Sequence, residues 1–217
     1  MSEEENMLVD REQYLANGVH IGTKAQHTSM DKYIFHVKKN QLAVLNLDKT
    51  DEKIREVAKV LADYDPEEIL VVGRTEQART PIKAFSNAIG SQLIDGRFMP
   101  GTLTNPQSEN FVEPEIVVVS NPEEDAQAIQ EAHDTNIPVI AIADSENEIE
   151  EIDHVIPANN KAENALGLVY FLLAREMAER NGEDFNYEVT DFGAEIKEVE
   201  EQETEEVEEE TDEEDEE

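Results

Sequence analysis

The stretch Ile69-Leu70-Val71-Val72-Gly73 decides the fold, because an apolar run of this length is typical of a strand buried on both faces of a parallel sheet. Before it, apolar residues recur at helical spacing from Ile54 to Ala62. After it, a second helix is expected over roughly residues 76–89, with Gly90 as its C-terminal stop. Strands that alternate with helices predict an α/β domain with a mostly parallel sheet and helices on both faces.

The same alternation continues outward in both directions. Short strands are expected at residues 34–37, 42–47, 93–94, 116–119, 138–143 and 155–156. Asn121-Pro122 predicts the start of a helix that ends near Thr135. A last, well-buried helix is expected over about residues 161–180.

Two helix starts depend on single residues. Asp48 or Thr50 is expected to cap the helix that contains Ile54. Pro81 fits poorly inside the helix expected over residues 76–89, so a start at a Thr80 cap with Pro81 in the first position is the alternative.

The formal net charge of −36, from 53 acidic and 17 basic residues, argues by itself against nucleic acid as a partner. The charge is unevenly placed, however. Residues 20–97 hold 12 basic and 11 acidic residues, whereas residues 181–217 hold 20 acidic residues and only Lys197. A surface that meets phosphate is therefore expected in the N-terminal half. The acidity elsewhere indicates adaptation to high salt, where a Debye length of about 3 Å suppresses surface repulsion.

Residues 1–190 are expected to form one α/β domain, and residues 191–217 a disordered acidic tail. Beyond Asn181 glutamate dominates, and such a segment buries too little surface to offset its ordering entropy. Four side chains at its start could still hold it on the domain, namely Phe185, Tyr187, Val189 and Phe192.

The chain has no cysteine, which excludes disulfides, thiolate zinc sites and cysteine nucleophiles. Residues 1–6 lack the basic-then-apolar layout of a signal peptide. The longest apolar run, residues 165–174, is about half the roughly 20 residues that span a bilayer. We therefore expect a cytoplasmic protein with no membrane partner.

A doubly wound α/β domain suggests a nucleotide at the carboxyl ends of its strands, but the motifs that cradle phosphate are missing from the sequence. Gly73-Arg74-Thr75 is the nearest match and leaves an enzyme that binds a nucleotide or sugar phosphate as the alternative. The five histidines are scattered without the spacing of a zinc site, so no cofactor and no metal are expected. Asp144 is either a catalytic carboxylate or, more often for an Asp that ends a strand, a cap of the next turn.

Residues 95–114 form the longest stretch without a regular pattern, and they begin DGRFMPGTLTNP. Loops of this length are usually functional, and the glycines and prolines here favour one path. Arg97 is the only cation of the loop. Its groups that can donate hydrogen bonds to phosphate or sugar are Thr102, Thr104 and Asn105. The loop is either a shaped docking element or a surface loop packed by Phe98 and Leu103.

Basic and aromatic residues also alternate around the hairpin expected at residues 34–47. The basic ones are Lys32, Lys38 and Lys39, and the aromatic ones are Tyr33, Phe35 and His36. This mixture suits RNA contact through phosphates and stacked bases. A solvated hairpin with core aromatics explains the same residues.

Several segments, in order and spacing, resemble the ribosomal small-subunit protein two family, in the archaeal and eukaryotic branch that includes ribosomal protein SA, the laminin-receptor precursor. They are HIGT at 20–23, GRFMPGTLTN at 96–105, EPEIVVVSNP at 113–122, and IPANNK at 156–161 followed by LLARE at 172–176. The segment at 96–105 is close to diagnostic. The chain departs from the family at Asn121, often Asp, and at Ala162, often Gly.

The resemblance implies a flavodoxin-like sheet, no catalysis and no small-molecule substrate. It implies a structural constituent of the small ribosomal subunit that contacts ribosomal RNA and neighbouring ribosomal proteins in assembly and translation. The acidity adds a halophilic archaeon as the expected source. A third class, an acidic chaperone-like protein acting through its tail, stays open.

On this reading we predict two sets of RNA contacts. Phosphate contacts are expected from Lys24, Lys38, Lys39, Arg74, Arg79, Arg97 and Lys161. Shaped hydrogen bonding is expected from Thr102, Thr104, Asn105, Asn159 and Asn160.

Overall fold

The computed structural model describes residues 7–194, and its centre is a five-stranded parallel sheet with the strand order β4-β3-β5-β6-β7. The strands are β3 (Ile69–Gly73), β4 (Gln92–Asp95), β5 (Ile116–Val119), β6 (Val139–Ala143) and β7 (His154–Pro157). The chain runs from β3 outward to β4, then returns to β5 on the other side of β3. This order is that of a doubly wound, flavodoxin-like sheet, and it confirms the predicted fold class.

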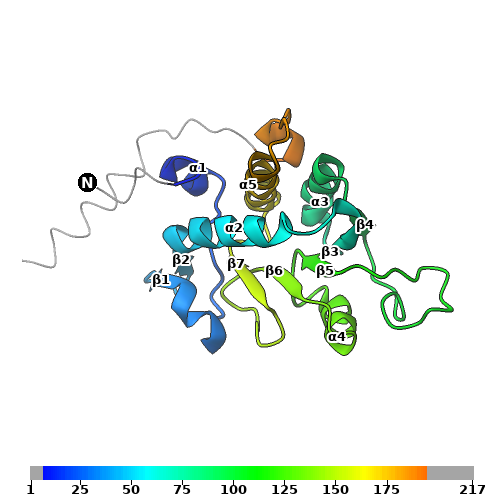
Figure 1. Cartoon of the computed structure of the whole chain (residues 1–217). Coiled ribbons are helices and arrows are strands. Elements are labelled where there is room, and N and C mark those ends of the chain that lie inside the picture. Colours follow the sequence, from blue (N-terminus) through cyan, green and yellow to red (C-terminus); the bar gives the residue numbers. More distant parts are fainter. Residues whose placement is uncertain (1–6, 195–217) are drawn as a thin grey trace, which may run out of the picture.

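Helices cover both faces of the sheet (Figure 1). The larger core lies under α2 (Leu47–Leu61), α3 (Glu76–Ile89) and α5 (Glu163–Asn181), and α4 (Ala126–Asp134) lies on the opposite face. Successive strand residues point to opposite faces, so Ile69 and Val71 enter the larger core while Leu70 and Val72 pack on the α4 side. Burial of both faces explains why the strands are continuously apolar.

Smaller elements lie at the β7 edge of the sheet, beside the N-terminal end of α2 (Figure 1). They are α1 (Arg11–Ala16), a 3₁₀ helix (Thr28–Tyr33), and an antiparallel hairpin of β1 (Ile34–Val37) and β2 (Ala43–Leu45). Two further 3₁₀ helices, Pro66–Glu68 and Val189–Phe192, precede β3 and follow α5.

The predicted cap of α2 was wrong, whereas the predicted range of α3 is confirmed. Asn46 caps α2, because its side-chain oxygen accepts hydrogen bonds from the N–H groups of Asp48 (2.9 Å) and Lys49 (3.3 Å). Helix α3 covers Glu76–Ile89, as its apolar spacing predicted, and it keeps Pro81 inside; the alternative start at a Thr80 cap was wrong. Burying the apolar face of α3 against the sheet and α5 outweighs the one helical hydrogen bond that proline cannot make.

The predicted start of α4 at Asn121-Pro122 was also wrong, since residues 121–125 form a turn and the helix begins at Ala126. The side chain of Asn121 accepts a hydrogen bond from the N–H of Glu123 (3.0 Å), as a cap would, but in a turn. The turn brings Asp125 back to the carboxyl edge of the sheet, where its side chain accepts a hydrogen bond from the N–H of Arg74.

Residues 183–194 fold back over α5 and α3, and the fully buried Phe192 packs edge-on against Phe171 with ring centroids 5.6 Å apart. Gly167 of α5 permits this contact, because a Cβ there would lie 2.5 Å from the carbonyl oxygen of Phe192 and 2.8 Å from the nitrogen of Ala194. The packed part of the chain therefore reaches Ala194, past the domain boundary predicted at 190. The tail predicted beyond it lies outside the described residues.

We predict that Gly167→Ala lowers the free energy of unfolding by about 1–3 kcal/mol, because the new methyl group forces the returning segment off α5. Urea denaturation monitored by circular dichroism measures the change. The exposed Glu179→Ala on the same helix is the control. Alanine normally favours a helix over glycine by about 1 kcal/mol, so a stabilised Gly167→Ala variant would contradict the close contact.

Candidate nucleic-acid interface

The crevice where a doubly wound sheet usually binds its ligand is occupied by a side chain of the chain itself. It lies at the carboxyl ends of β3 and β5, where the strand order reverses. The carboxylate of Asp125 accepts hydrogen bonds there from the backbone N–H groups of Arg74 (3.1 Å) and Asn121 (3.3 Å). Burial raises the pKa of Asp125 to about 7. A protein carboxylate thus takes the two donors that a bound phosphate would need.

Gly73, at the end of β3 beside this crevice, is tightly packed. A Cβ at Gly73 would lie 2.9 Å from Cδ1 of Ile82 and 3.0 Å from Oγ of Ser120. This glycine therefore serves the close packing of α3 on the sheet.

The carboxyl ends of β6 and β7 are covered by residues 17–27. The N–H of Thr23 donates to Oγ of Ser145 (2.9 Å), and Asn159 donates through Nδ2 to the carbonyl of Gly18 (3.1 Å). Gly22 is enclosed, since a Cβ there would lie 2.9 Å from both the carbonyl oxygen of Ala43 and Oγ of Ser145. The chain fills this edge of its sheet with its own backbone.

Asp144 caps the turn that follows β6, which is the role predicted as more common for an Asp at the end of a strand. Its carboxylate accepts the N–H of Ser145 (2.6 Å), and its own N–H donates to Oδ1 of Asn147 (2.8 Å). Asn160 donates to the same Asn147 oxygen (2.9 Å) and to the carbonyl of Ile142 (3.1 Å). Burial raises the pKa of Asp144 to about 6.

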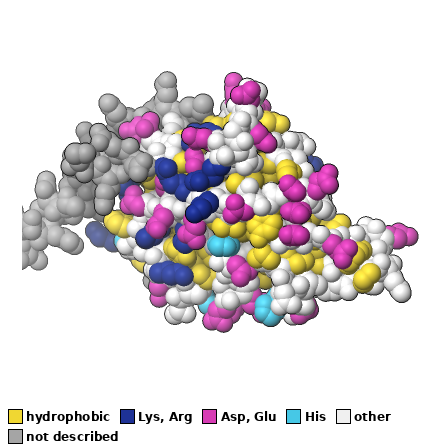
Figure 2. Space-filling view, viewed as in Figure 1, with side chains coloured by type: hydrophobic (Ala, Val, Ile, Leu, Met, Phe, Trp, Pro, Cys, Tyr) yellow, Lys and Arg dark blue, Asp and Glu magenta, His cyan; other side chains and the backbone are white. Residues whose placement is uncertain are grey.

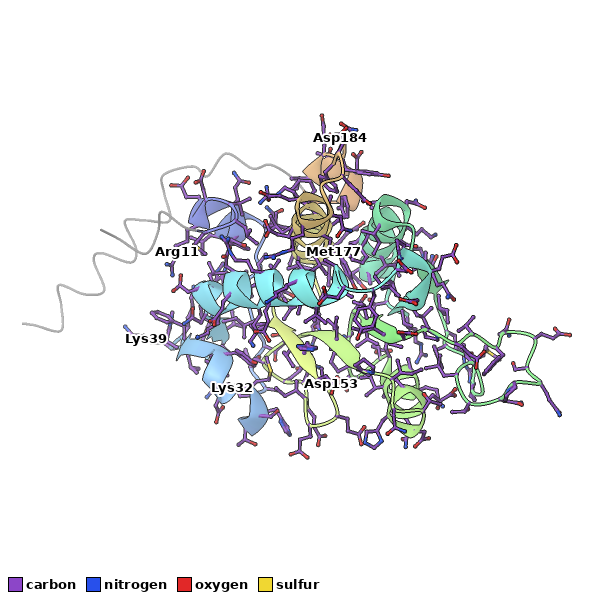
Figure 3. The ribbon with its side chains drawn as sticks, viewed as in Figure 1. Arg11, Lys32, Lys39, Asp153, Met177 and Asp184 are labelled. Carbon is purple, nitrogen blue, oxygen red and sulfur yellow. The ribbon has the colours of Figure 1, made fainter. Side chains whose placement is uncertain are left out.

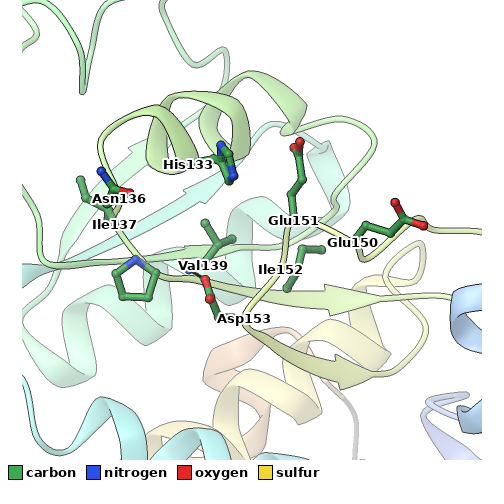
Figure 4. A pocket seen from close by; sticks show the side chains of 9 residues that line it. His133, Asn136, Ile137, Val139, Glu150, Glu151, Ile152 and Asp153 are labelled. Atoms are coloured by element: carbon green, nitrogen blue, oxygen red, sulfur yellow. Dashed lines mark hydrogen bonds between the residues drawn. The ribbon is translucent and has the colours of Figure 1, made fainter.

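A cavity of about 410 Å³ opens at the opposite, amino end of β6 and β7 (Figure 4). Its apolar floor includes Val139 and Ile152, and Glu150 and Glu151 are exposed around it. The carboxylate of Asp153 is tied to the N–H of Val139 (2.8 Å). Carboxylates repel phosphate, and this is the end of the sheet away from the usual ligand crevice, so the cavity does not favour a nucleotide-binding enzyme. Within residues 7–194 no cluster of His, Asp or Glu side chains suits a metal ion.

The irregular loop at residues 96–114 is present as predicted, and one buried side chain of α4 shapes it. The carboxylate of Glu131 accepts hydrogen bonds from the N–H groups of Gly101 (2.7 Å) and Leu103 (3.0 Å) and from the hydroxyl of Thr104 (3.2 Å). Burial disfavours the charge of Glu131, but these bonds and one from Gln127 outweigh it and hold the pKa below its usual range. The sequence carries no signal for this role, because a glutamate on an amphipathic helix normally faces solvent.

The loop is both packed and shaped. Phe98 and Leu103 are buried against the α4 side of the sheet. The hydroxyl of buried Thr102 donates to the carbonyl of Met99 (2.6 Å), and Oδ1 of Asn105 accepts the N–H of Gln107 (3.1 Å). Many polar groups predicted to contact RNA are thus used within the domain, as are those of the buried Asn159 and Asn160.

The cations predicted to contact phosphate differ in what they contact within the domain. Three form ion pairs, namely Arg74 with Glu124 (3.7 Å), Arg79 with Asp95 (3.0 Å), and Lys161 with Glu146. Lys24, Lys38 and Arg97 are exposed and form no ion pair within residues 7–194. Lys39 is exposed beside Lys38.

Most of these exposed cations gather on one part of the molecule, which we call the hairpin surface. It comprises Lys24, Lys32, Phe35, His36, Val37, Lys38 and Lys39. Figure 2 shows Lys and Arg side chains on the side that carries α1, α2 and the hairpin, whereas acidic and apolar side chains dominate the side of α4 and the long loop. Lys32 and Lys39 point outward from that side, with Arg11 above them (Figure 3). Phe35 is 65% exposed and Val37 46%.

These features define an α/β binding scaffold, with its ligand crevice closed by its own side chains and an exposed basic and aromatic hairpin. The profile of the ribosomal protein S2 family matches residues 14–111 and 108–180. The small ribosomal subunit protein uS2 of Haloquadratum walsbyi, a halophilic archaeon, is 45% identical over 194 residues, which are 89% of this chain and 70% of that protein. The chain belongs to the ribosomal protein S2 family, as its motifs predicted. None of the helices in residues 7–194 is long and apolar enough to cross a membrane.

We predict that Glu131→Gln loosens residues 96–114, because the amide offers one acceptor where the carboxylate has two. Removing hydrogen bonds to a charged group costs about 2 kcal/mol. Limited proteolysis with chymotrypsin should cut the variant within residues 96–114 faster than the unchanged protein. The exposed Asp134→Asn of the same helix is the control, and equal cleavage of Glu131→Gln and the unchanged protein would contradict the anchoring role.

We predict that Asp144→Asn stabilises the protein at pH 7.5. The folded-state pKa of about 6 exceeds the usual 3.8, so the native state binds the extra proton and stability falls as pH rises from about 4 to above 6. The asparagine can still accept the Ser145 N–H and escapes this loss, which is at most about 3 kcal/mol. Urea denaturation at pH 5 and pH 7.5 should show a gain that grows with pH. The exposed Glu148→Gln should show no such growth.

Proposed function

We propose that this chain is a structural constituent of the small ribosomal subunit and docks on ribosomal RNA chiefly with the hairpin surface. Membership of the ribosomal protein S2 family supports the structural role. The observation that carries the RNA contact is the set of exposed cations beside an aromatic hairpin in a chain of net charge −36. A cluster of exposed lysines on an otherwise acidic protein suits a polyanionic partner such as RNA.

In this proposal the remaining predicted contacts contribute less to RNA binding than the hairpin surface. Arg74, Arg79 and Lys161 already neutralise neighbouring carboxylates, so each offers phosphate less net charge. Arg97 is the exception, because it stands unpaired on the long loop. Thr102, Asn159 and Asn160 would act indirectly, by holding the loop and the N-terminal segment in shape. The acidic residues beyond Ala194 repel phosphate, which assigns RNA contact to the domain.

The same proposal excludes catalysis and places the protein in the cytoplasm with other small-subunit proteins as neighbours. The enzyme alternative needs a free crevice at the strand ends, and Asp125 and residues 17–27 fill that place. We expect neither nucleotides nor sugar phosphates to raise the melting temperature.

We predict that Lys38→Gln with Lys39→Gln, and separately Arg97→Glu, weaken incorporation into small subunits, because each removes two units of charge facing phosphate. Tagged protein would be expressed in the native host, and its share in the small-subunit fraction of a sucrose gradient measured at the host's own salt concentration. A several-fold loss is expected.

The matched control is Gln130→Glu with Asn136→Asp, which adds two negative charges to exposed positions around α4. It should leave incorporation unchanged. An equal loss in all three variants would make net charge responsible and remove the named cations as contacts. An unchanged protein that stays at the top of the gradient would refute the ribosomal role itself.

A further inference from the structure

Phe35 is the most exposed large apolar side chain among residues 7–194, at 65%. It lies where the register of the hairpin shifts between Ile34 and His36, as in a β-bulge, and its ring faces solvent. The ring of His36 stands edge-on beside it, with centroids 5.3 Å apart. A native protein that presents an aromatic ring on a bulge places it for contact.

The hairpin edge is poorly suited to adding a strand from another protein. The edge strand β1 has only four residues, it carries the bulge, and Lys38 and Lys39 follow it directly. Short length, a bulge and terminal lysines are the devices that prevent strands from pairing at an edge. The contact made by Phe35 is therefore one of its ring face.

Lys38 and Lys39 lie on the hairpin turn that follows this strand, and hydrogen bonds hold that turn in one conformation. The N–H of Lys38 donates to the carbonyl of Leu42 (2.9 Å), and the N–H of Gln41 donates to the carbonyl of Lys38 (2.8 Å). The side chain of Asn40 accepts the N–H of Leu42 (3.1 Å). Charge and ring are thus presented together on an ordered turn, which reduces the entropy lost on binding.

We propose that the hairpin surface holds one unpaired RNA nucleotide, with its base stacked on Phe35 and its flanking phosphates near Lys38 and Lys39. This inference rests on the proposed function and names the chemistry of that contact. The bases of an A-form duplex are stacked on one another and cannot lie on a protein ring, whereas bases in loops and bulges can. Lysines beside the ring favour an anionic partner over an apolar one, and an exposed ring among them suits a nucleic acid, which offers both phosphates and bases.

Stacking also explains how this surface binds in concentrated salt. Binding by counterion release weakens steeply as salt rises, and screening shortens the reach of each lysine to about 3 Å near 1 M. Stacking of a base on an aromatic ring does not depend on charge. Phe35 therefore supplies the part of the binding free energy that persists in high salt. The lysines supply the part that falls as the salt concentration rises.

The test uses small subunits depleted of this protein and rebinding of the full chain at about 0.5 M and about 3 M KCl, values that bracket the decline of phosphate contacts. Phe35→Leu keeps an apolar side chain but removes the ring, and it should raise the dissociation constant about tenfold at both concentrations. Phe35→Trp should restore binding to within about twofold. Lys38→Gln with Lys39→Gln should weaken binding mainly at the lower concentration.

The matched control is Val37→Ala, which trims the neighbouring exposed side chain and leaves the ring in place. Chemical probing of the bases in rebound subunits supplies the second readout. One base should gain reactivity with Phe35→Leu and none with Val37→Ala. Melting curves should be unchanged for both, because neither side chain is in the core.

Normal affinity of Phe35→Leu, or an unchanged pattern of base reactivity, would overturn the stacking proposal. Equal weakening by Phe35→Leu and Val37→Ala with unaltered bases would assign the surface to an apolar protein partner. Failure of the unchanged protein to rebind would refute the proposed function, and the nucleotide contact with it. The three results are distinguishable because they differ in which variant binds and whether a base responds.

Discussion

The closure of the carboxyl edge of the sheet by the protein's own polar groups is the constraint on which the rest of the structure depends. Parallel strands end with backbone N–H groups that need acceptors, and most doubly wound proteins leave some of them for a ligand. Here Asp125 takes the donors that follow β3 and β5, and Ser145 takes one from the segment that covers β6. An edge that is satisfied internally leaves the outer surface as the place for partners.

This closure buries two carboxyl groups, and their contacts are those of a structural scaffold more than those of an enzyme. Asp125 and Asp144 are buried, and burial raises the pKa of each. Enzymes use such groups to transfer protons to a substrate. In this chain no crevice among residues 7–194 exposes them at the sheet edge, and their oxygens hold backbone groups of turns. Perturbed pKa values here mark structural positions.

Acidity and the proposed RNA binding are compatible in this molecule because charge is separated in space. The hairpin surface carries exposed lysines, and the α4 side carries the acidic cavity and no Lys or Arg between Phe98 and Asn160. Screening in high salt removes most of the repulsion between the acidic side and the phosphates of RNA. It weakens phosphate contacts as well, which gives apolar and stacking contacts a larger share of the affinity.

The sequence by itself determined the parallel sheet, the order of helices and strands, and the family, because these depend on apolar periodicity and on short exact motifs. Only the tertiary structure decided which polar residues face solvent. Thr102 and Asn160 match family motifs yet are buried, and Glu131 resembles a surface residue yet anchors the long loop. Hydrogen-bond partners far apart in sequence, such as Glu131 with Gly101 or Asp125 with Arg74, meet only after folding. The spacing of apolar residues in the sequence predicts which of them are buried. Whether a polar side chain is buried and bonded depends on the donors and acceptors that folding brings beside it.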